Sequence, residues 1–280
     1  MAMGGNPVFN NPNAFRSQPQ RSANAGSAML AGQSQMSSQQ LNELYNQPSA
    51  GPAQTGRMTY DDVIMKTMAC LALVLAGAAV GWMIPALMIP GMLVGLVLGL
   101  VNAFKKEPSK ALILAYAGAE GVFVGGLSMV LDSMYPGVAP QAVLGTVCVF
   151  AVTLLLFKSG KVRATPKAMK FFMIAIIGYA VFSLVNLGLQ MFGVMDTPWG
   201  VRGIEINIMG IGIPLGVIIG LFAIGLAAFS LIMDFTSIEQ GVRAGVDRKY
   251  SWTAAFGLTV TLIWLYVEIL RLLAILRGTE

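Results

Sequence analysis

Polar and apolar residues divide the chain into a polar first segment and a long, mostly apolar remainder. Residues 1–57 are rich in Asn, Gln, Ser, Gly, Ala and Pro, and seven apolar stretches follow from Met58 onward. Each stretch is close to the roughly 20 residues that an α-helix needs to cross a bilayer. The stretches lie at 67–84, 86–104, 111–131, 141–157, 169–195, 206–233 and 252–276. The pattern predicts an all-α, polytopic membrane protein with seven transmembrane helices.

The polar first segment has too few large apolar side chains to offset the entropy that folding would cost it. We therefore predict two parts, a disordered tail at 1–57 and a seven-helix transmembrane domain at 58–280. Both a plain solvated tail and a tail that binds a protein partner fit this composition.

Composition agrees with a membrane protein and removes several kinds of chemistry. The chain has 280 residues, of which 56% are hydrophobic and 11% charged, against about 25% charged residues in a soluble domain. It contains no histidine, which excludes His-based catalytic triads, haem ligation by His and most zinc sites. A retinal protein needs a lysine in its last span, and none lies between Ser251 and Glu280. We expect no cofactor, no enzymatic activity and no nucleic-acid partner.

Basic residues alternate along the connections between the predicted spans. Those after the second, fourth and sixth spans are Lys105, Lys106, Lys110, Lys158, Lys161, Arg163, Lys167, Lys170, Arg243, Arg248 and Lys249. The intervening connections carry almost no basic residues: Asp132 follows the third span, and Asp196, Arg202 and Glu205 follow the fifth. The positive-inside rule then places the tail in the cytoplasm, in what we expect to be a bacterial plasma membrane. Seven spans would put the C-terminus outside, whereas Arg277 favours the inside.

Few ionisable residues fall within the apolar stretches, and each is a candidate for function because lipid penalises an unused charge. Glu120 lies midway along the third stretch. It is either a protonated or paired functional group, or a structural hydrogen-bonding residue.

Two further acids lie on consecutive spans. Asp234 lies near the end of the sixth, and Glu268 lies deep in the seventh, three residues before Arg271. In one interpretation Glu268 and Arg271 form a self-contained ion pair along their helix. In the other, Glu268 faces Asp234 and Arg271 is a movable counter-charge.

A pair of carboxylates in a poorly solvated place would form a proton switch, because both cannot easily ionise at once. Divalent cations would compete with the shared proton. Calcium prefers six to eight oxygen ligands, so Asp234 and Glu268 alone would make a weak, transient metal site.

The stretches that carry these acids resemble the Bax inhibitor family, also called the transmembrane Bax inhibitor motif proteins, in its bacterial branch. The similar segments are AYAGAEGVFVGGLS in the third span, LIMDFTSIE at the end of the sixth and LYVEILRLL in the seventh. The resemblance implies a seven-helix bundle with the last helix at its centre. It also implies a pH-sensitive calcium leak gated by one acid on each of the last two helices, here Asp234 and Glu268.

The chain departs from the family pattern in three places. Glu268 stands where the family usually has Asp, and the connection between the two acids is longer. The segment 86–104 has no Lys or Arg to match the family's basic latch, so Arg271 is our own candidate for that part. The function hypotheses are a pH-dependent leak for calcium or another cation, and a non-transporting protein that regulates a membrane protease or a stress response. The second would use the tail or the loop 239–249 to bind its partner.

Overall fold

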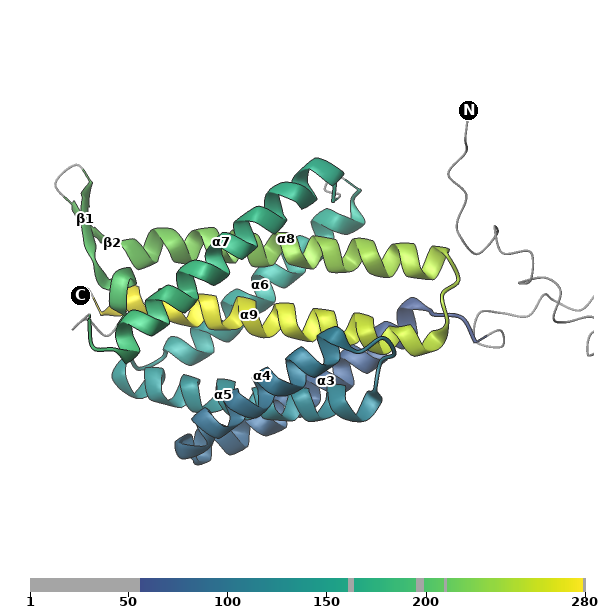
Figure 1. Cartoon of the computed structure of the whole chain (residues 1–280), viewed down its shortest axis with the longest axis horizontal. Coiled ribbons are helices and arrows are strands. Elements are labelled where there is room, and N and C mark those ends of the chain that lie inside the picture. Colours follow the sequence, from purple (N-terminus) through teal and green to yellow (C-terminus); the bar gives the residue numbers. More distant parts are fainter. Residues whose placement is uncertain (1–55, 161–163, 195–198, 209–210, 279–280) are drawn as a thin grey trace, which may run out of the picture. The chain divides into compact units, whose positions relative to one another are not determined.

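Seven helices that are long and apolar enough to cross a membrane make up the domain (Figure 1). A computed structural model describes residues 56–160, 164–194, 199–208 and 211–278, so nearly all of the predicted disordered tail lies outside the described residues. The helices are α3 (Tyr60–Met83), α4 (Met88–Phe104), α5 (Lys110–Met134), α6 (Val138–Lys158), α7 (Pro166–Met191), α8 (Leu215–Arg243) and α9 (Ser251–Arg277). Short 3-10 turns precede α4, the strand β1 (Glu205–Ile208) and α9: η1 (Pro85–Leu87), η2 (Gly200–Gly203) and η3 (Arg248–Tyr250). The prediction of an all-α polytopic membrane protein is confirmed.

The last helix lies at the centre of the bundle, as the resemblance implied. Its most apolar window is 61% buried, compared with 44% for α5, 39% for α8 and 11% for each of α4, α6 and α7. It packs against α3, α5, α6 and α8. In Figure 1, α9 runs between α8 on one side and the group of α3, α4 and α5 on the other. The buried polar side chains of α9, which include Thr259, Thr261 and Glu268, are therefore surrounded by protein rather than lipid.

Local sequence signals account for the helix ends. Thr59 caps α3 by accepting a hydrogen bond from the backbone N–H of Asp62 at 3.1 Å. Pro85 starts η1 and separates α3 from α4 in a tight hairpin. Gly137 adopts a φ of 86° in the turn between α5 and α6, where a side chain would be strained.

The sixth predicted span, 206–233, is wrong at both ends. Its first residues form a hairpin of β1 (Glu205–Ile208) and β2 (Ile211–Pro214), in which Ile206 pairs with Ile213. Helix α8 begins only after Pro214 and continues to Arg243. Hydropathy does not distinguish the hairpin from a span, because the isoleucines of the hairpin are as apolar as the residues of a transmembrane helix. At the other end, the helix continues beyond the apolar stretch into polar sequence. Consequently Asp234 lies inside α8, and residues 239–243 belong to that helix rather than to a loop.

Helices α3 and α5 approach each other backbone to backbone. Gly77 and Gly81 on α3 face Gly121 and Gly125 on α5, and the glycines of each pair are four residues apart. A Cβ added at any of the four would fall within contact distance of a carbonyl oxygen of the other helix. This arrangement, small residues spaced by four on both partners, is the usual way for helices to pack closely in lipid.

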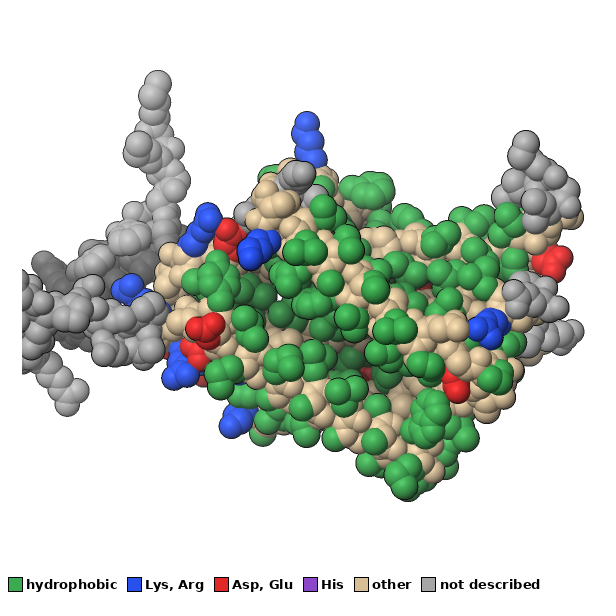
Figure 2. All heavy atoms as spheres, turned by 180° about the vertical axis from the view of Figure 1, so that it is seen from behind, with side chains coloured by type: hydrophobic (Ala, Val, Ile, Leu, Met, Phe, Trp, Pro, Cys, Tyr) green, Lys and Arg blue, Asp and Glu red, His purple; other side chains and the backbone are tan. Residues whose placement is uncertain are grey.

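The surface has a broad apolar belt with charged groups at its ends (Figure 2). We call the end at which α9 begins the basic end; its described basic side chains include Lys105, Lys106, Arg243, Arg248 and Lys249. The other, the hairpin end, carries η2, β1 and β2. An apolar belt between charged ends is the surface expected of a protein that spans a bilayer.

Two ion pairs tie the connections together at the basic end. Arg248 Nη2 lies 2.7 Å from Asp62 Oδ1, and Lys249 Nζ lies 2.9 Å from Glu107 Oε1. The hydrogen bond from the Lys249 ammonium holds the pKa of Glu107 below its ordinary value. These pairs join the start of α3 and the α4–α5 connection to the α8–α9 connection.

Candidate functional site

Asp234 lies on the wall of a pocket that opens at the basic end. The pocket has a volume of about 480 Å³ and is lined by the end of α4, the α4–α5 connection, α8 and α9. Asp234 is the only acid among its described lining residues, and Lys105 is the only base. On α8 the lining runs from Asp234 to Gly241, a separation of seven residues or about 10 Å of helical rise, and Asp234 is the lining residue of α8 farthest from the helix end at Arg243. The pocket thus brings a single carboxylate into contact with space well inside the bundle.

The carboxylate of Asp234 is held by a hydroxyl from α9. Thr261 Oγ1 donates a hydrogen bond to Asp234 Oδ2 at 2.7 Å, and Ser230 Oγ lies 3.4 Å from the same hydroxyl. The residue that faces Asp234 across the α8–α9 contact is therefore a threonine. A neutral hydroxyl leaves the carboxylate free to keep its charge or to take up a proton without competition from a second acid.

An apolar layer closes the bundle beyond Asp234. Leu231 lies three residues before Asp234 on α8, and Leu265 lies four residues after Thr261 on α9. Both leucines are completely buried, as is Ala227 one turn further along α8, and all three belong to one apolar core. These residues form a packed apolar layer between the level of Asp234 and the next charged group along α9.

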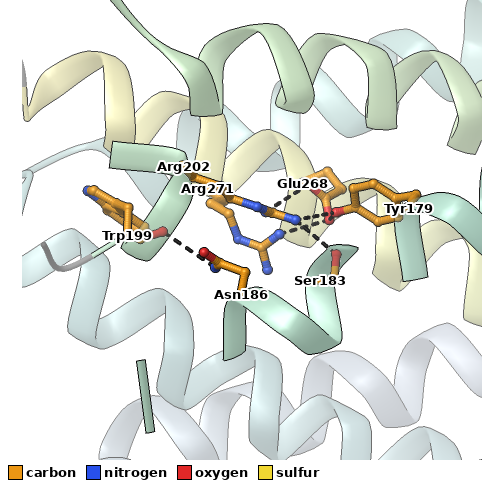
Figure 3. Close-up of polar contacts among 7 residues, drawn as sticks. All are labelled: Tyr179, Ser183, Asn186, Trp199, Arg202, Glu268 and Arg271. Atoms are coloured by element: carbon orange, nitrogen blue, oxygen red, sulfur yellow. Dashed lines mark hydrogen bonds and ion pairs between the residues drawn. The ribbon is translucent and has the colours of Figure 1, made fainter. Parts of the chain in front are cut away.

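Glu268 lies beyond that layer, in a cluster of charged and hydroxyl groups (Figure 3). Its side chain is 3% exposed, and its Oε1 accepts hydrogen bonds from the Tyr179 hydroxyl and from Arg271 Nη1, the latter at 2.9 Å. Arg202 Nη1 lies 3.8 Å from Glu268 Oε2. Arg202 Nη2 also donates to the Tyr179 hydroxyl at 2.9 Å and to Ser183 Oγ at 3.0 Å. Two guanidinium groups thus share one carboxylate.

The position of Arg202 depends on how η2 is anchored to α7. Asn186 Oδ1 accepts a hydrogen bond from the backbone N–H of Val201 at 2.7 Å, and the Asn186 amide donates to the carbonyl of Trp199. Gly200 permits the turn by adopting a φ of 57°. As Figure 3 shows, these contacts point the Arg202 side chain from η2 toward Tyr179 and Glu268.

The structure does not bring Asp234 and Glu268 together. Glu268 lies seven residues beyond Thr261, the residue that contacts Asp234, which is a rise of about 10 Å along α9. The buried Leu265 lies between the two levels. A proton shared directly by these two acids, and a metal site formed by both, are therefore absent from this conformation of the described chain. Within the described residues, no group of three or more Cys, Asp or Glu side chains is placed to hold a metal ion.

The other predicted residues have simple environments. Arg271 pairs with Glu268 along the same helix, which is the first of the two interpretations, and within the described residues no hydrogen bond or ion pair joins it to Asp234. Glu120 lies half-buried on α5 against α4, where a Cβ added at Gly95 would lie 2.8 Å from its Oε1. It is not among the residues that line the pocket.

Sequence reasoning missed Arg202, Tyr179 and Thr261. Arg202 was counted among the polar residues of a connection, although its side chain is 4% exposed. One signal was available: it is a base in a connection that otherwise lacks them. Tyr179 and Thr261 sit in apolar helices, and nothing in their local sequence separates them from ordinary core residues.

Comparison with known proteins agrees with the architecture and with the resemblance. No curated protein sequence matches the chain significantly. The family model described as Bax inhibitor 1 like matches residues 6–278, which is nearly the whole chain. The chain is thus a multi-pass membrane protein that belongs to the Bax inhibitor 1-like family.

Proposed function

We propose that this protein is a slow, pH-dependent leak for cations, with calcium as the principal ion, and that Asp234 is its ion-attracting and proton-sensing group. The observation that carries the proposal is the position of Asp234. It is the only described acid lining the pocket, and it lies between the pocket and the apolar layer. Membership of the family and the seven-span bundle support transport rather than catalysis.

The charge of Asp234 explains both the attraction and the pH response. Ionised, it is a negative group at the inner part of a pocket whose only other described charge is Lys105. A cation is drawn to it, because a charge in a poorly solvated place acts more strongly than in water. Once Asp234 is protonated, the pocket no longer attracts cations. The rate of cation entry therefore falls as the pH falls through the range in which Asp234 takes up its proton.

The oxygen ligands around Asp234 fit a passing ion better than a stored one. Besides the Asp234 carboxylate and the Thr261 hydroxyl that binds it, the pocket lining on α8 and α9 offers the hydroxyls of Ser237 and Thr253. Calcium favours six to eight oxygens and tight sites use several carboxylates. One carboxylate with hydroxyls and water gives weak binding, from which an ion can leave.

The positive-inside rule supports a cytoplasmic location for the basic end, and with it a pocket that opens to the cytoplasm. In this orientation the protein lies in a bacterial plasma membrane with its tail inside. Glu268 and Arg202 then lie toward the outer surface, separate from Asp234.

Flux through the wild-type protein tests the proposal. The full-length chain is reconstituted into liposomes that contain a fluorescent calcium indicator, and calcium is added outside at a series of pH values. We expect faster entry than into protein-free liposomes, with a rate that increases from acid to neutral pH. Vesicles as tight as protein-free ones at every pH would reject the leak. That result would favour the non-transporting role, in which the chain regulates a membrane protease or another complex.

A further inference from the structure

The segment η2 is a short 3-10 helix packed into the hairpin end of the bundle. It packs against α7 and α8, and its Arg202 reaches across to Glu268 on α9. Arginine is among the residues least often buried, yet this one has a side chain that is only 4% exposed. One residue of a connection is thus inserted among the side chains of three transmembrane helices.

The cluster around Arg202 carries an excess of positive charge. Arg202 and Arg271 contribute two positive charges, and Glu268 contributes the only negative charge among the residues in direct contact with them. An ion that has passed Asp234 and the apolar layer would next meet this cluster. A cation is repelled by an uncompensated positive charge, most strongly where water is scarce.

The contact between Arg202 and Glu268 is the longest polar contact in the cluster. Arg271 donates a true hydrogen bond to Glu268 at 2.9 Å within one helix, whereas Arg202 and Glu268 are 3.8 Å apart, too far for a hydrogen bond. Within the described part of the chain, Arg202 Nε and Glu268 Oε2 are buried without a hydrogen-bond partner. An outward shift of η2 would break this long ion pair and the two hydrogen bonds that Arg202 donates to Tyr179 and Ser183, and it would leave the Arg271 pair intact.

We infer that Arg202 is a gating residue, which closes the hairpin end to cations while η2 is inserted and opens it when η2 withdraws. The inference rests on the proposed cation leak and adds a second barrier to it. Asp234 attracts the ion at the basic end, and Arg202 repels it at the opposite end. Withdrawal of the guanidinium removes the excess positive charge and leaves the carboxylate of Glu268 with Arg271 alone.

Flux measurements on Arg202→Gln test the gate. We expect Arg202→Gln to leak calcium severalfold faster than the wild type at neutral pH, because it lacks both the charge and the ion pair that hold η2. Tyr179→Phe keeps Arg202 and the aromatic ring but removes the hydroxyl that binds both Arg202 and Glu268. It should also increase the rate, which keeps the test decisive if Arg202→Gln does not fold.

Two controls separate gating from a general loss of charge. Arg271→Gln removes the same charge from the cluster but leaves Arg202 and the contacts of η2 in place, so its rate should increase less than that of Arg202→Gln. Arg243→Gln removes an exposed charge at the basic end and should leave the rate unchanged. Rates for folded Arg202→Gln or Tyr179→Phe equal to a measurable wild-type rate would overturn the gate and leave the proposed leak standing. An equal increase in Arg271→Gln would also overturn it. Loss of flux in the wild type itself would instead reject the leak.

Discussion

Replacement of Gly125 with alanine should destabilise the protein severely, although it adds only one methyl group. Alanine favours a helix interior over glycine by about 1 kcal/mol, so helix propensity alone predicts stabilisation. The new Cβ, however, would fall on the carbonyl oxygen and Cα of Ala78 in α3. These are backbone atoms that cannot rotate away. The helices must move apart, and we expect a loss at or beyond the upper end of the roughly 1–3 kcal/mol typical of overpacking.

Gly118 provides a matched control on the same helix. A Cβ added there has no heavy atom within 4 Å, so Gly118→Ala should be neutral or stabilising. Unfolding of both variants by sodium dodecyl sulfate in mixed micelles, followed by tryptophan fluorescence, measures the difference. Equal stability of Gly125→Ala and Gly118→Ala would contradict the close packing of α3 and α5.

Replacement of Glu268 with glutamine should be the most damaging single change in the charged cluster. The substitution keeps the shape of the side chain and an oxygen that can accept from Tyr179. It removes the only negative charge in contact with Arg202 and Arg271, which leaves Arg202 buried with no opposite charge. Removal of one partner of a buried ion pair typically costs about 3–5 kcal/mol, so we expect a loss near the lower end of that range.

The same unfolding assay tests this prediction, with Glu205→Gln as the control. Glu205 is exposed on β1, and surface substitutions of this kind usually change stability by less than about 0.5 kcal/mol. If Glu268→Gln unfolded at the same point as Glu205→Gln, the cluster would have no role in holding η2 on the bundle.

Hydropathy alone predicts the number and order of the helices, because each must match the thickness of the bilayer. Hydropathy fails where apolar residues form a structure other than a transmembrane helix. Ile206 and Ile213 lie in a hairpin outside α8, and only their strand pairing distinguishes them from a span. It also fails where a helix continues into water, since Arg243 ends α8 well beyond the apolar stretch. That error placed Asp234 at a helix end instead of inside the bundle.

The site was harder to predict than the fold, for a geometric reason. The cost of charge in lipid singles out Asp234 and Glu268 as candidates. Which residues they meet depends on how α8 and α9 are shifted along each other, and the connection between them does not reveal this. The structure pairs Asp234 with Thr261 and leaves Glu268 at another level. Arg202 comes from a connection between two predicted spans, so its contact with Glu268 could be found only in three dimensions.

The calcium flux of Asp234→Asn tests the central claim most directly. Wild type, Asp234→Asn and Asp61→Asn are reconstituted at equal density, and initial rates of calcium entry are measured from acid to neutral pH. Asp61 is exposed at the start of α3 and undergoes the same chemical change. We expect Asp61→Asn to retain the wild-type rate and its increase with pH, whereas Asp234→Asn should be slow at every pH and unresponsive to protons. An Asp234→Asn protein with the wild-type rate and the wild-type pH dependence would contradict the account.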